Sequence, residues 1–214
     1  MSTDTKQVVT EEKPVEEKPV EEKPAAKPAA KPAAKPAAKP AAKPAAKPVE
    51  LPAFEKSISD KVVEKFGDKI QVEFVKENRV GIKVNREDVH DVAEFIRDGL
   101  NYDHVESVSG VDYPQDKEIE VVYHIGSYSD SSLAKQILVL ATRAQREENP
   151  IPGKDATKLP TLRDIFYSVE FHEREVFEMF GVYFTGHPDN RRLLLPEDWA
   201  DLPPLRKDFA IKGR

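Results

Sequence analysis

The densest group of residues able to do chemistry is the stretch FHEREVFEMFGVYFTGHPDNRR, residues 171–192. Glu173, Arg174 and Glu175 place opposite charges next to one another on a predicted helix. The planar guanidinium of Arg174 offers five donors suited to pairing with carboxylates. The alternation therefore predicts a salt-bridged face that holds Arg174. No nucleophile in the stretch is followed by a base in a catalytic pattern.

Two catalytic alternatives begin from the same residues. His172 and Glu173 match the first two residues of the helix motif that binds zinc in some proteases, but Val176 occupies the position of the second histidine ligand. This spacing cannot bring two imidazoles to one zinc ion, so we expect no metal site. Glu173, Glu175 and Asp189 are the carboxylates that a stand-alone soluble enzyme could use for acid–base chemistry. The sequence has no cysteine, which excludes disulfides and thiolate ligands for iron–sulfur clusters.

Turn-forming residues and cations follow the charged stretch. Gly181 permits a left-handed residue where the helix ends, and residues 187–189, His-Pro-Asp, suit an ordered turn. Beyond them the chain carries four cations and one counter-charge, at Arg191, Arg192, Arg206, Lys207 and Asp208.

The elements that must position these residues begin after residue 52. Residues 54–66 carry apolar side chains at helical spacing, and Gly67 is expected to end this helix. In residues 70–84 apolar and polar side chains alternate, which predicts a hairpin with its turn near residues 77–78. Residues 89–100 repeat apolar side chains at helical spacing between Asn85 or Asp88, as a possible cap, and Asn101.

Three more strands are predicted, at residues 104–113, 119–125 and 136–142. The last contains the run Ile-Leu-Val-Leu-Ala, which also suits a buried helix; its β-branched residues favour a strand. The order of elements predicts an α+β fold, a two-layer domain in which helices cover one face of a mixed sheet.

The C-terminal third differs from this pattern. Thr161 and Asp164 resemble the ends of a capping box, so residues 165–180 are predicted as one or two short helices. Residues 186–214 contain four prolines and no regular period, which predicts an extended C-terminal arm. Its apolar residues need burial against another surface, and we expect partner subunits to supply it for Leu193, Leu195, Trp199 and Phe209.

The first 52 residues form a low-complexity tail with ten of the 18 prolines, including Ala-Ala-Lys-Pro repeats. Such a composition cannot build a core and predicts disorder. We therefore divide the chain into a tail (1–52), an α+β core (53–149), a loop and short helices (150–185) and a partner-binding arm (186–214).

Charge and hydropathy limit the possible partners. The overall charge is −6, and the tail has ten lysines against eight acids, which leaves −8 for the remainder. An acidic domain repels nucleic acid. No stretch of about 18 apolar residues occurs, so membrane contact is expected only through partner subunits.

The motif residues resemble a known family over residues 173–209. Glu-Arg-Glu, an aromatic-glycine pair, Phe-x-Gly-His-Pro-Asp-x-Arg-Arg and a late Arg-Lys-Asp-Phe are similar to the C subunit of respiratory complex I, also called NADH-quinone oxidoreductase. Glu178 stands close to where quinone-linked members carry aspartate, and residues 193–199, LLLPEDW, resemble the counterparts in archaeal membrane-bound hydrogenase or sulfur-reducing complexes.

The resemblance implies a cofactor-free scaffold subunit in the peripheral arm of an ion-pumping redox complex. It implies packing on a large D-type subunit, a small iron–sulfur subunit in the same complex, and iron–sulfur clusters with a possible nickel–iron centre in those partners. It implies a peripheral position on the cytoplasmic side of the membrane, with protons, sulfur compounds or a quinone left open as acceptor. The alternatives are the stand-alone enzyme and a binding module based on the tail.

The residues expected to bind partners or form the motif are Glu173, Arg174, Glu175, Gly181, Phe184, Gly186, His187, Pro188, Asp189, Arg191, Arg192, Trp199, Arg206, Lys207, Asp208 and Phe209.

Overall fold

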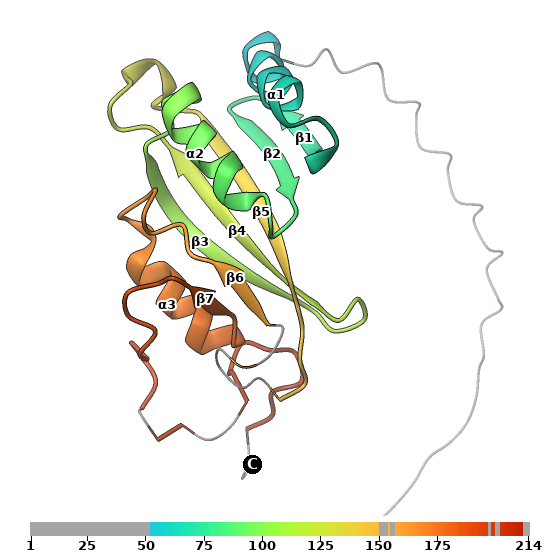
Figure 1. Ribbon diagram of the computed structural model, residues 1–214, viewed down its shortest axis with the longest axis vertical. Coiled ribbons are helices and arrows are strands. Elements are labelled where there is room, and N and C mark those ends of the chain that lie inside the picture. Colours follow the sequence, from blue (N-terminus) through green and yellow to red (C-terminus); the bar gives the residue numbers. More distant parts are fainter. Residues whose placement is uncertain (1–51, 150–153, 155–156, 197, 200–201, 212–214) are drawn as a thin grey trace, which may run out of the picture. The chain divides into compact units, whose positions relative to one another are not determined.

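The computed structural model describes residues 52–149, 154, 157–196, 198–199 and 202–211 (Figure 1). The tail predicted for residues 1–52 lies outside them except for Pro52. All the described residues belong to one compact unit.

A five-stranded mixed sheet forms the centre of this unit. Its strands run in the order β1-β2-β5-β4-β3. The β2–β5 pair is parallel and the three other pairs are antiparallel. The mixed sheet predicted from the alternating patterns is therefore confirmed. The strands are β1 (Ile70–Lys76), β2 (Arg79–Val84), β3 (His104–Tyr113), β4 (Glu118–Gly126) and β5 (Ile137–Gln145).

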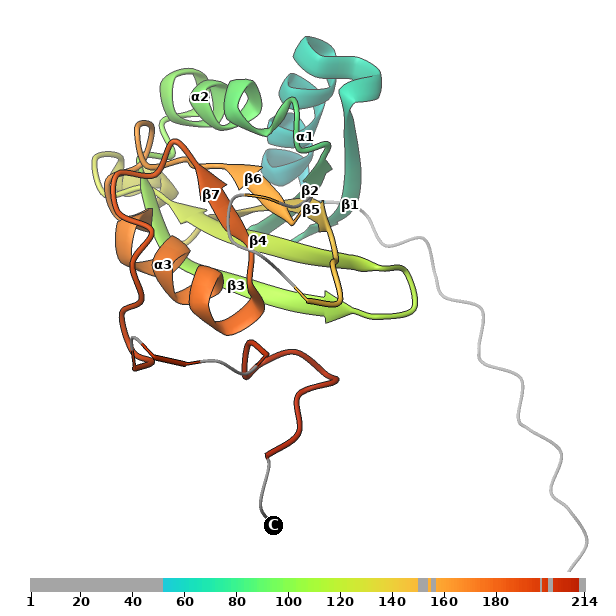
Figure 2. The ribbon, with the colours of Figure 1, turned by 60° about the horizontal axis from the view of Figure 1, so that its bottom comes forward.

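The helices are α1 (Ala53–Phe66), α2 (Val89–Leu100) and α3 (Val169–Phe180). They lie on one face of the sheet (Figures 1 and 2). Alternate residues of β4, such as Val121 and Tyr123, are fully buried beneath them in one apolar core. The α+β, two-layer fold is therefore confirmed.

The start of the third helix differs from the prediction. α3 begins at Val169 after Ser168, not at residue 165. Thr161 does not cap it, because its hydroxyl accepts the amide hydrogen of Arg163 and donates to Glu173. The apparent capping box was a local turn motif with the same residue types. At α2, Asp88 occupies the cap position without a capping hydrogen bond.

A small second sheet was not predicted. β6 (Lys158–Pro160) pairs in parallel with β7 (Tyr183–Thr185), and the two strands bracket α3 in the sequence. Three-residue strands are too short to show an alternating pattern. Their pairing brings the two ends of the α3 segment together (Figure 2).

Two glycines set the position of α3. Gly181 ends the helix with φ of 81°, a left-handed conformation that glycine adopts without steric cost. Gly110 in β3 lies beneath the Phe180 ring, and a Cβ at this position would approach that ring to 2.5 Å. The absence of a side chain at Gly110 therefore lets the last turn of α3 rest on the sheet.

The Gly110→Ala substitution should lower the free energy of unfolding by about 1–3 kcal/mol, because the added methyl group overpacks the Phe180 contact. Ser109→Ala is the matched control, since Ser109 is the exposed neighbour on the same strand. Urea unfolding of both variants measures the effect. Equal stability of the two variants would contradict the proposed packing.

Candidate functional site

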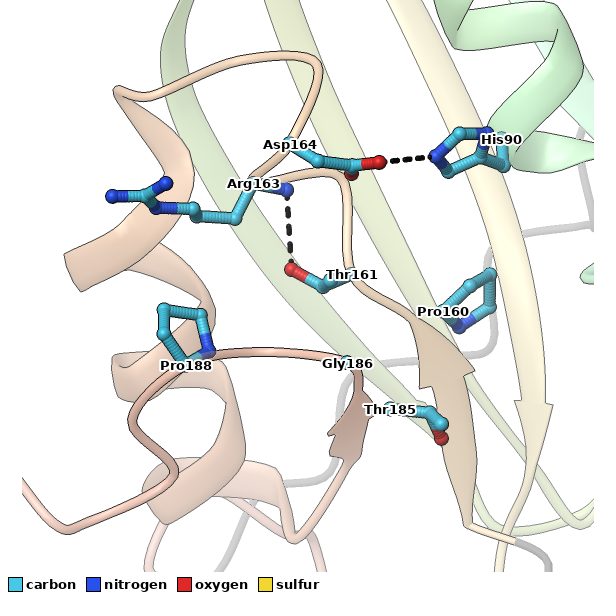
Figure 3. Close-up of a pocket in the computed structure, with 8 residues that line it drawn as sticks. All are labelled: His90, Pro160, Thr161, Arg163, Asp164, Thr185, Gly186 and Pro188. Atoms are coloured by element: carbon cyan, nitrogen blue, oxygen red, sulfur yellow. Dashed lines mark hydrogen bonds and ion pairs between the residues drawn. The ribbon is translucent and has the colours of Figure 1, made fainter.

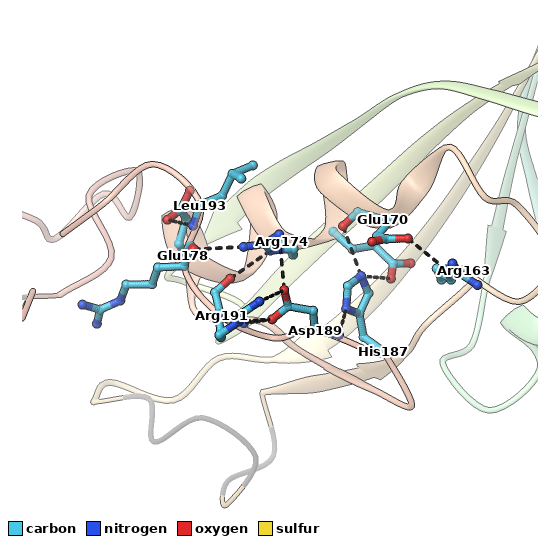
Figure 4. A network of polar contacts seen from close by, with 10 residues as sticks. Arg163, Glu170, Arg174, Glu178, His187, Asp189, Arg191 and Leu193 are labelled. Atoms are coloured by element: carbon cyan, nitrogen blue, oxygen red, sulfur yellow. Dashed lines mark hydrogen bonds and ion pairs between the residues drawn. The ribbon is translucent and has the colours of Figure 1, made fainter. Parts of the chain in front are cut away.

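The polar residues of the stretch 171–192 lie where one face of α3 meets the C-terminal arm. The described residues of the arm are 186–196, 198–199 and 202–211. Figure 4 shows Arg174 and Glu178 from α3 beside Asp189, Arg191 and Leu193. The arm has turns and bends but no helix or strand in its described part. Its backbone groups therefore need partners other than regular secondary structure.

Glu178 supplies partners for the arm's amides. Its side chain accepts hydrogen bonds from the amides of Leu193, Leu194 and Leu195 at 2.9–3.1 Å. The residue is 4% exposed. A buried carboxylate is stabilised when several amides donate to it, so Glu178 and this turn depend on each other.

Arg174 supplies partners for the arm's carbonyl groups. Its Nε and Nη2 atoms each donate to a carbonyl oxygen, of Arg191 and Arg192 respectively, at 3.0 Å. Nη1 lies 3.5 Å from the Asp189 carboxylate. The prediction that a carboxylate holds Arg174 is confirmed for Asp189, but the two backbone contacts were not foreseen.

Arg206 fixes the far end of the arm. It is 2% exposed, and it donates to the carbonyl oxygen of Phe180 at 2.6 Å and to that of Glu147. The sequence suggested that this cation faces a partner. That expectation is wrong for Arg206, because its guanidinium is buried within its own domain. We call Arg174, Glu178 and Arg206 the backbone clamp.

A buried ion pair supports the same end of the arm. Asp112 of β3 is 2% exposed, and it accepts from Arg146 at 2.6 Å and from the Lys207 amide at 2.9 Å. Burial opposes ionisation, but these donors hold the pKa of Asp112 below its ordinary value. Arg146 also pairs with Asp208 at 2.8 Å.

Contacts within the arm involve other residues of the predicted motif. Arg191 pairs with Asp189 at 2.9 Å, and Arg192 donates to the carbonyl oxygens of Pro196 and Trp199. The rings of Trp199 and Phe209 lie 6.0 Å apart and are partly buried. Most of the motif therefore shapes the arm of its own chain.

Glu173 occupies the opposite side of α3 from the exposed Glu175. Its side chain is fully buried and accepts from the Leu162 amide, the Thr161 hydroxyl and the Tyr123 hydroxyl at 2.9, 2.5 and 3.2 Å. Burial raises the pKa of Glu173 to about 7. The predicted salt-bridged face is therefore wrong for Glu173, because the helix turns this carboxyl group into the core.

The predicted turn at His187 is also part of the core. The His187 side chain is fully buried, with Nε2 3.1 Å from the Glu170 carbonyl oxygen and Nδ1 3.1 Å from the Asp189 nitrogen. Gly186 precedes it with φ of 87°, and Phe184 is fully buried. The turn therefore attaches the first residues of the arm to α3.

The carboxylates considered for an enzyme are not brought together. Glu173 is buried, Glu175 is exposed on another side of α3, and Asp189 is paired with arginines. Across the described ranges, no group of three or more His, Asp or Glu side chains is placed to hold a metal ion. Within the same ranges, no helix has the length and apolarity needed to cross a membrane.

The arm leaves apolar side chains pointing outward. Leu193 and Leu194 are 41% and 62% exposed, and Leu205 and Ile211 are 56% and 68% exposed. Leu195, Trp199 and Phe209 are partly buried. The clamp therefore holds the backbone while several large side chains remain available for contact.

The roles of several residues that complete the site were not predicted from the sequence. Glu178 lies four positions after Arg174, a spacing that places both on one helix face and could have indicated a shared target. Asp112 and Arg146 gave no local signal, because they meet only through the sheet. Tyr123 looked like an ordinary strand residue, and Thr161 looked like a helix cap.

The fold and the clamp define a class of protein: a small α+β domain that holds an irregular C-terminal arm by its backbone. The family described as the 30-kDa subunit of respiratory-chain NADH dehydrogenase matches residues 82–214. The chain belongs to this family, and the resemblance predicted from the motif is confirmed. It is a peripheral-arm subunit of a complex I-like, multi-subunit oxidoreductase.

Similarities to individual proteins agree with this family assignment. The chain is 35% identical to the C subunit of F(420)H(2) dehydrogenase of Methanosarcina mazei over 61% of this chain and 75% of the relative. It is 35% identical to the C subunit of NADH-quinone oxidoreductase of Chlorobium phaeobacteroides over 72% of this chain and 87% of the relative. A chain of the membrane-bound sulfane sulfur reductase, an archaeal respiratory membrane complex, has a similar structure. The TM-score is 0.62 with 26% identity, and the match covers 73% of this chain and 86% of that chain.

The Glu178→Gln substitution should loosen the turn at residues 193–195, because hydrogen bonds to a charged acceptor contribute about 1.5–3 kcal/mol each and a neutral amide accepts more weakly. Limited proteolysis of the full chain should then cut the arm at least several-fold faster than in the wild type. Glu175→Gln, on the exposed side of the same helix, is the control. Equal cleavage rates in both variants would exclude the role of Glu178.

The pKa of Glu173 also predicts a pH dependence of stability. Its folded-state pKa, about 7, lies above the ordinary value of 4.5, so the stability that its protonated form contributes is present below pH 4.5 and is lost as pH rises through 7. Glu173→Gln should therefore gain stability relative to the wild type between pH 5 and pH 8, by about 3 kcal/mol at most. Chemical unfolding at the two pH values measures this difference. A difference independent of pH would show that Glu173 is ionised throughout.

Proposed function

We propose that the chain is a cofactor-free scaffold subunit that packs on the large D-type subunit of an ion-pumping redox complex. The observation that carries the proposal is the clamped arm, whose backbone is bound by its own domain while Leu193 and Leu194 remain 41% and 62% exposed. Exposed apolar side chains on an ordered segment are typical of protein–protein contact sites.

Preorganisation makes such an arm suitable for docking. An unanchored segment would lose conformational freedom on binding, which weakens association. Here Glu178 and Arg174 already order residues 191–195. Burying one leucine side chain against a partner contributes about 1.5–3 kcal/mol, so the leucines at 193, 194 and 205 supply much of the attraction we propose.

The names of the relatives support a scaffold role. They include an F(420)H(2) dehydrogenase, an NADH-quinone oxidoreductase and a sulfane sulfur reductase, whose electron donors and acceptors differ. A component shared by all three is suited to a task that does not depend on the substrate. We assign the redox chemistry, including iron–sulfur clusters and a nickel–iron centre in hydrogenase-like members, to the D-type subunit and a small iron–sulfur subunit. We place the chain on the cytoplasmic side of the membrane, held there by these partners.

Introducing charge at the exposed leucines tests the proposal. In the Leu193→Asp/Leu194→Asp variant, expressed as the full chain in cells that contain the complex, affinity purification from membranes should recover the partner subunits at least tenfold less than the wild type does. The aspartates would have to be buried in the contact, at a large desolvation cost. Val63→Asp is the control, because Val63 is 43% exposed on α1.

Normal recovery of the partners with the double variant would refute docking through this part of the arm. Equal loss with the Val63→Asp control would mean that any exposed apolar residue is sensitive, which would also contradict a dedicated arm surface. If the double variant loses mainly a subunit other than the large D-type subunit, the exposed leucines contact that subunit instead.

A further inference from the structure

Two aromatic rings lie exposed on the outward face of α3. Tyr167, in the turn that leads into the helix, is 74% exposed, and Phe171, in the first turn of the helix, is 58% exposed. On the opposite face, Val169 and Val176 are buried in the core. The packing of the domain therefore leaves most of both rings uncovered.

The arm continues this outward face. Phe171, Arg174 and Glu178 follow one another at helical spacing, so their side chains share one side of α3. The amides of residues 193–195 cover Glu178 there, and the first two leucines of this turn are exposed. The exposed leucines thus take over the outward face where the exposed aromatic residues end.

Arg174 joins the aromatic half of this surface to the leucine half. Its guanidinium carbon lies 5.8 Å from the centre of the Phe171 ring, and its nitrogens donate to the carbonyl oxygens of Arg191 and Arg192. Figure 4 shows Arg174 and Leu193 close together along one side of the helix. One side chain therefore contacts both halves and fixes their relative position.

Arg163 orders the other end of the surface. Figure 3 shows the Thr161 hydroxyl accepting the amide hydrogen of Arg163 at the wall of a pocket of about 380 Å³. The Arg163 side chain is directed away from His90 in the same view. Its guanidinium pairs with Glu170 at 3.1 Å and lies 4.4 Å from the centre of the Tyr167 ring. This stacking orders Tyr167 before any partner binds, which reduces the freedom lost on association.

A docking surface needs more area than the exposed leucines of the arm provide. A standard protein–protein interface buries about 800 Å² on each partner. An aromatic side chain buries about 150–250 Å², and two smaller leucine side chains supply only a fraction of the area required. Tyr167 and Phe171 adjoin these leucines and are themselves apolar, so they are suited to extend the contact.

We propose that Tyr167, Phe171, Leu193 and Leu194 form one continuous docking surface, the α3 ridge, which fits an apolar groove of the large D-type subunit. This inference rests on the docking of the arm proposed above and extends it to the helix. Aromatic side chains are enriched among the residues that dominate binding energy at protein interfaces. The two rings should therefore contribute to assembly as strongly as the two leucines.

The charges beside the rings define the chemistry of the groove. Arg163 is paired with Glu170, and Arg174 lies 3.5 Å from Asp189. These cations already have carboxylate partners within the chain. Because an unpaired charge is costly to bury, the groove should be uncharged where it meets the rings.

Crosslinking within the assembled complex tests the α3 ridge. Full chains carrying the photoreactive amino acid benzoylphenylalanine in place of Phe171, Leu194 or Tyr128 are expressed in cells that contain the complex. Chains labelled at position 171 and at position 194 should both crosslink to the large subunit. Tyr128 is 70% exposed on the loop after β4, and labelling there should give at least tenfold less of this product.

Truncation of the rings measures their contribution. Tyr167→Ala/Phe171→Ala should lower the recovery of the large subunit in affinity purification from membranes at least tenfold. Phe54→Ala/Tyr128→Ala is the matched control, because it removes two rings that are 48% and 70% exposed elsewhere on the domain. In the isolated Tyr167→Ala/Phe171→Ala chain, the amides of residues 193–195 should keep their wild-type protection from hydrogen exchange. Faster exchange there would show that the rings act by ordering the arm, which would overturn direct contact.

The outcomes separate the α3 ridge from the proposal for the arm. A crosslink to the large subunit from position 194 but not from position 171 would overturn the ridge and leave docking through the arm intact. Undiminished recovery with Tyr167→Ala/Phe171→Ala would do the same. A crosslink from position 171 but not from position 194 would contradict docking through the arm, and with it the continuous surface. Crosslinks from position 171 to another subunit, or to a second copy of this chain, would also overturn the ridge.

Discussion

The structure depends on one constraint: an irregular arm must find hydrogen-bond partners for its backbone. Helices and sheets satisfy these groups internally, whereas the arm has no such ladder in its described residues. Glu178 accepts from three successive amides of the arm, and Arg174 donates to two of its carbonyl groups. Arg206 works in the opposite direction, because this arm side chain donates to the carbonyl group of Phe180 in the domain. Since the backbone is bound from the domain side, exposed leucines such as Leu194 point outward. The clamp thus converts an irregular segment into an ordered surface.

The clamp works only because α3 is held rigidly on the sheet. Phe180 rests over Gly110, and Gly181 ends the helix in a left-handed turn. The buried carboxyl group of Glu173 joins the helix to Tyr123 and to the loop at Thr161. The same helix therefore presents one acid to the core and another to the arm, which links the packing of the domain to the position of the docking surface.

The sequence predicted the sheet, the first two helices and the family well, because alternating and helical apolar patterns are local and the motif is long. The roles of its residues were predicted less well. Arg206 looked like a docking cation and Glu173 like part of a surface ion pair, since residue type alone does not reveal burial. The partners of Arg174 and Glu178 are mainly backbone groups 15–18 positions away, which side-chain identity does not encode. β6 and β7 were too short to leave a pattern.

Amide hydrogen exchange on the full chain, alone and within the purified complex, tests the central claim most directly. If the domain clamps the arm, the amides of residues 193–195 are already protected in the isolated chain, because Glu178 binds them without a partner. Assembly then adds little protection at these amides. Exchange of the same amides at the rate of an unstructured peptide in the isolated chain, with protection appearing only in the complex, would contradict the account.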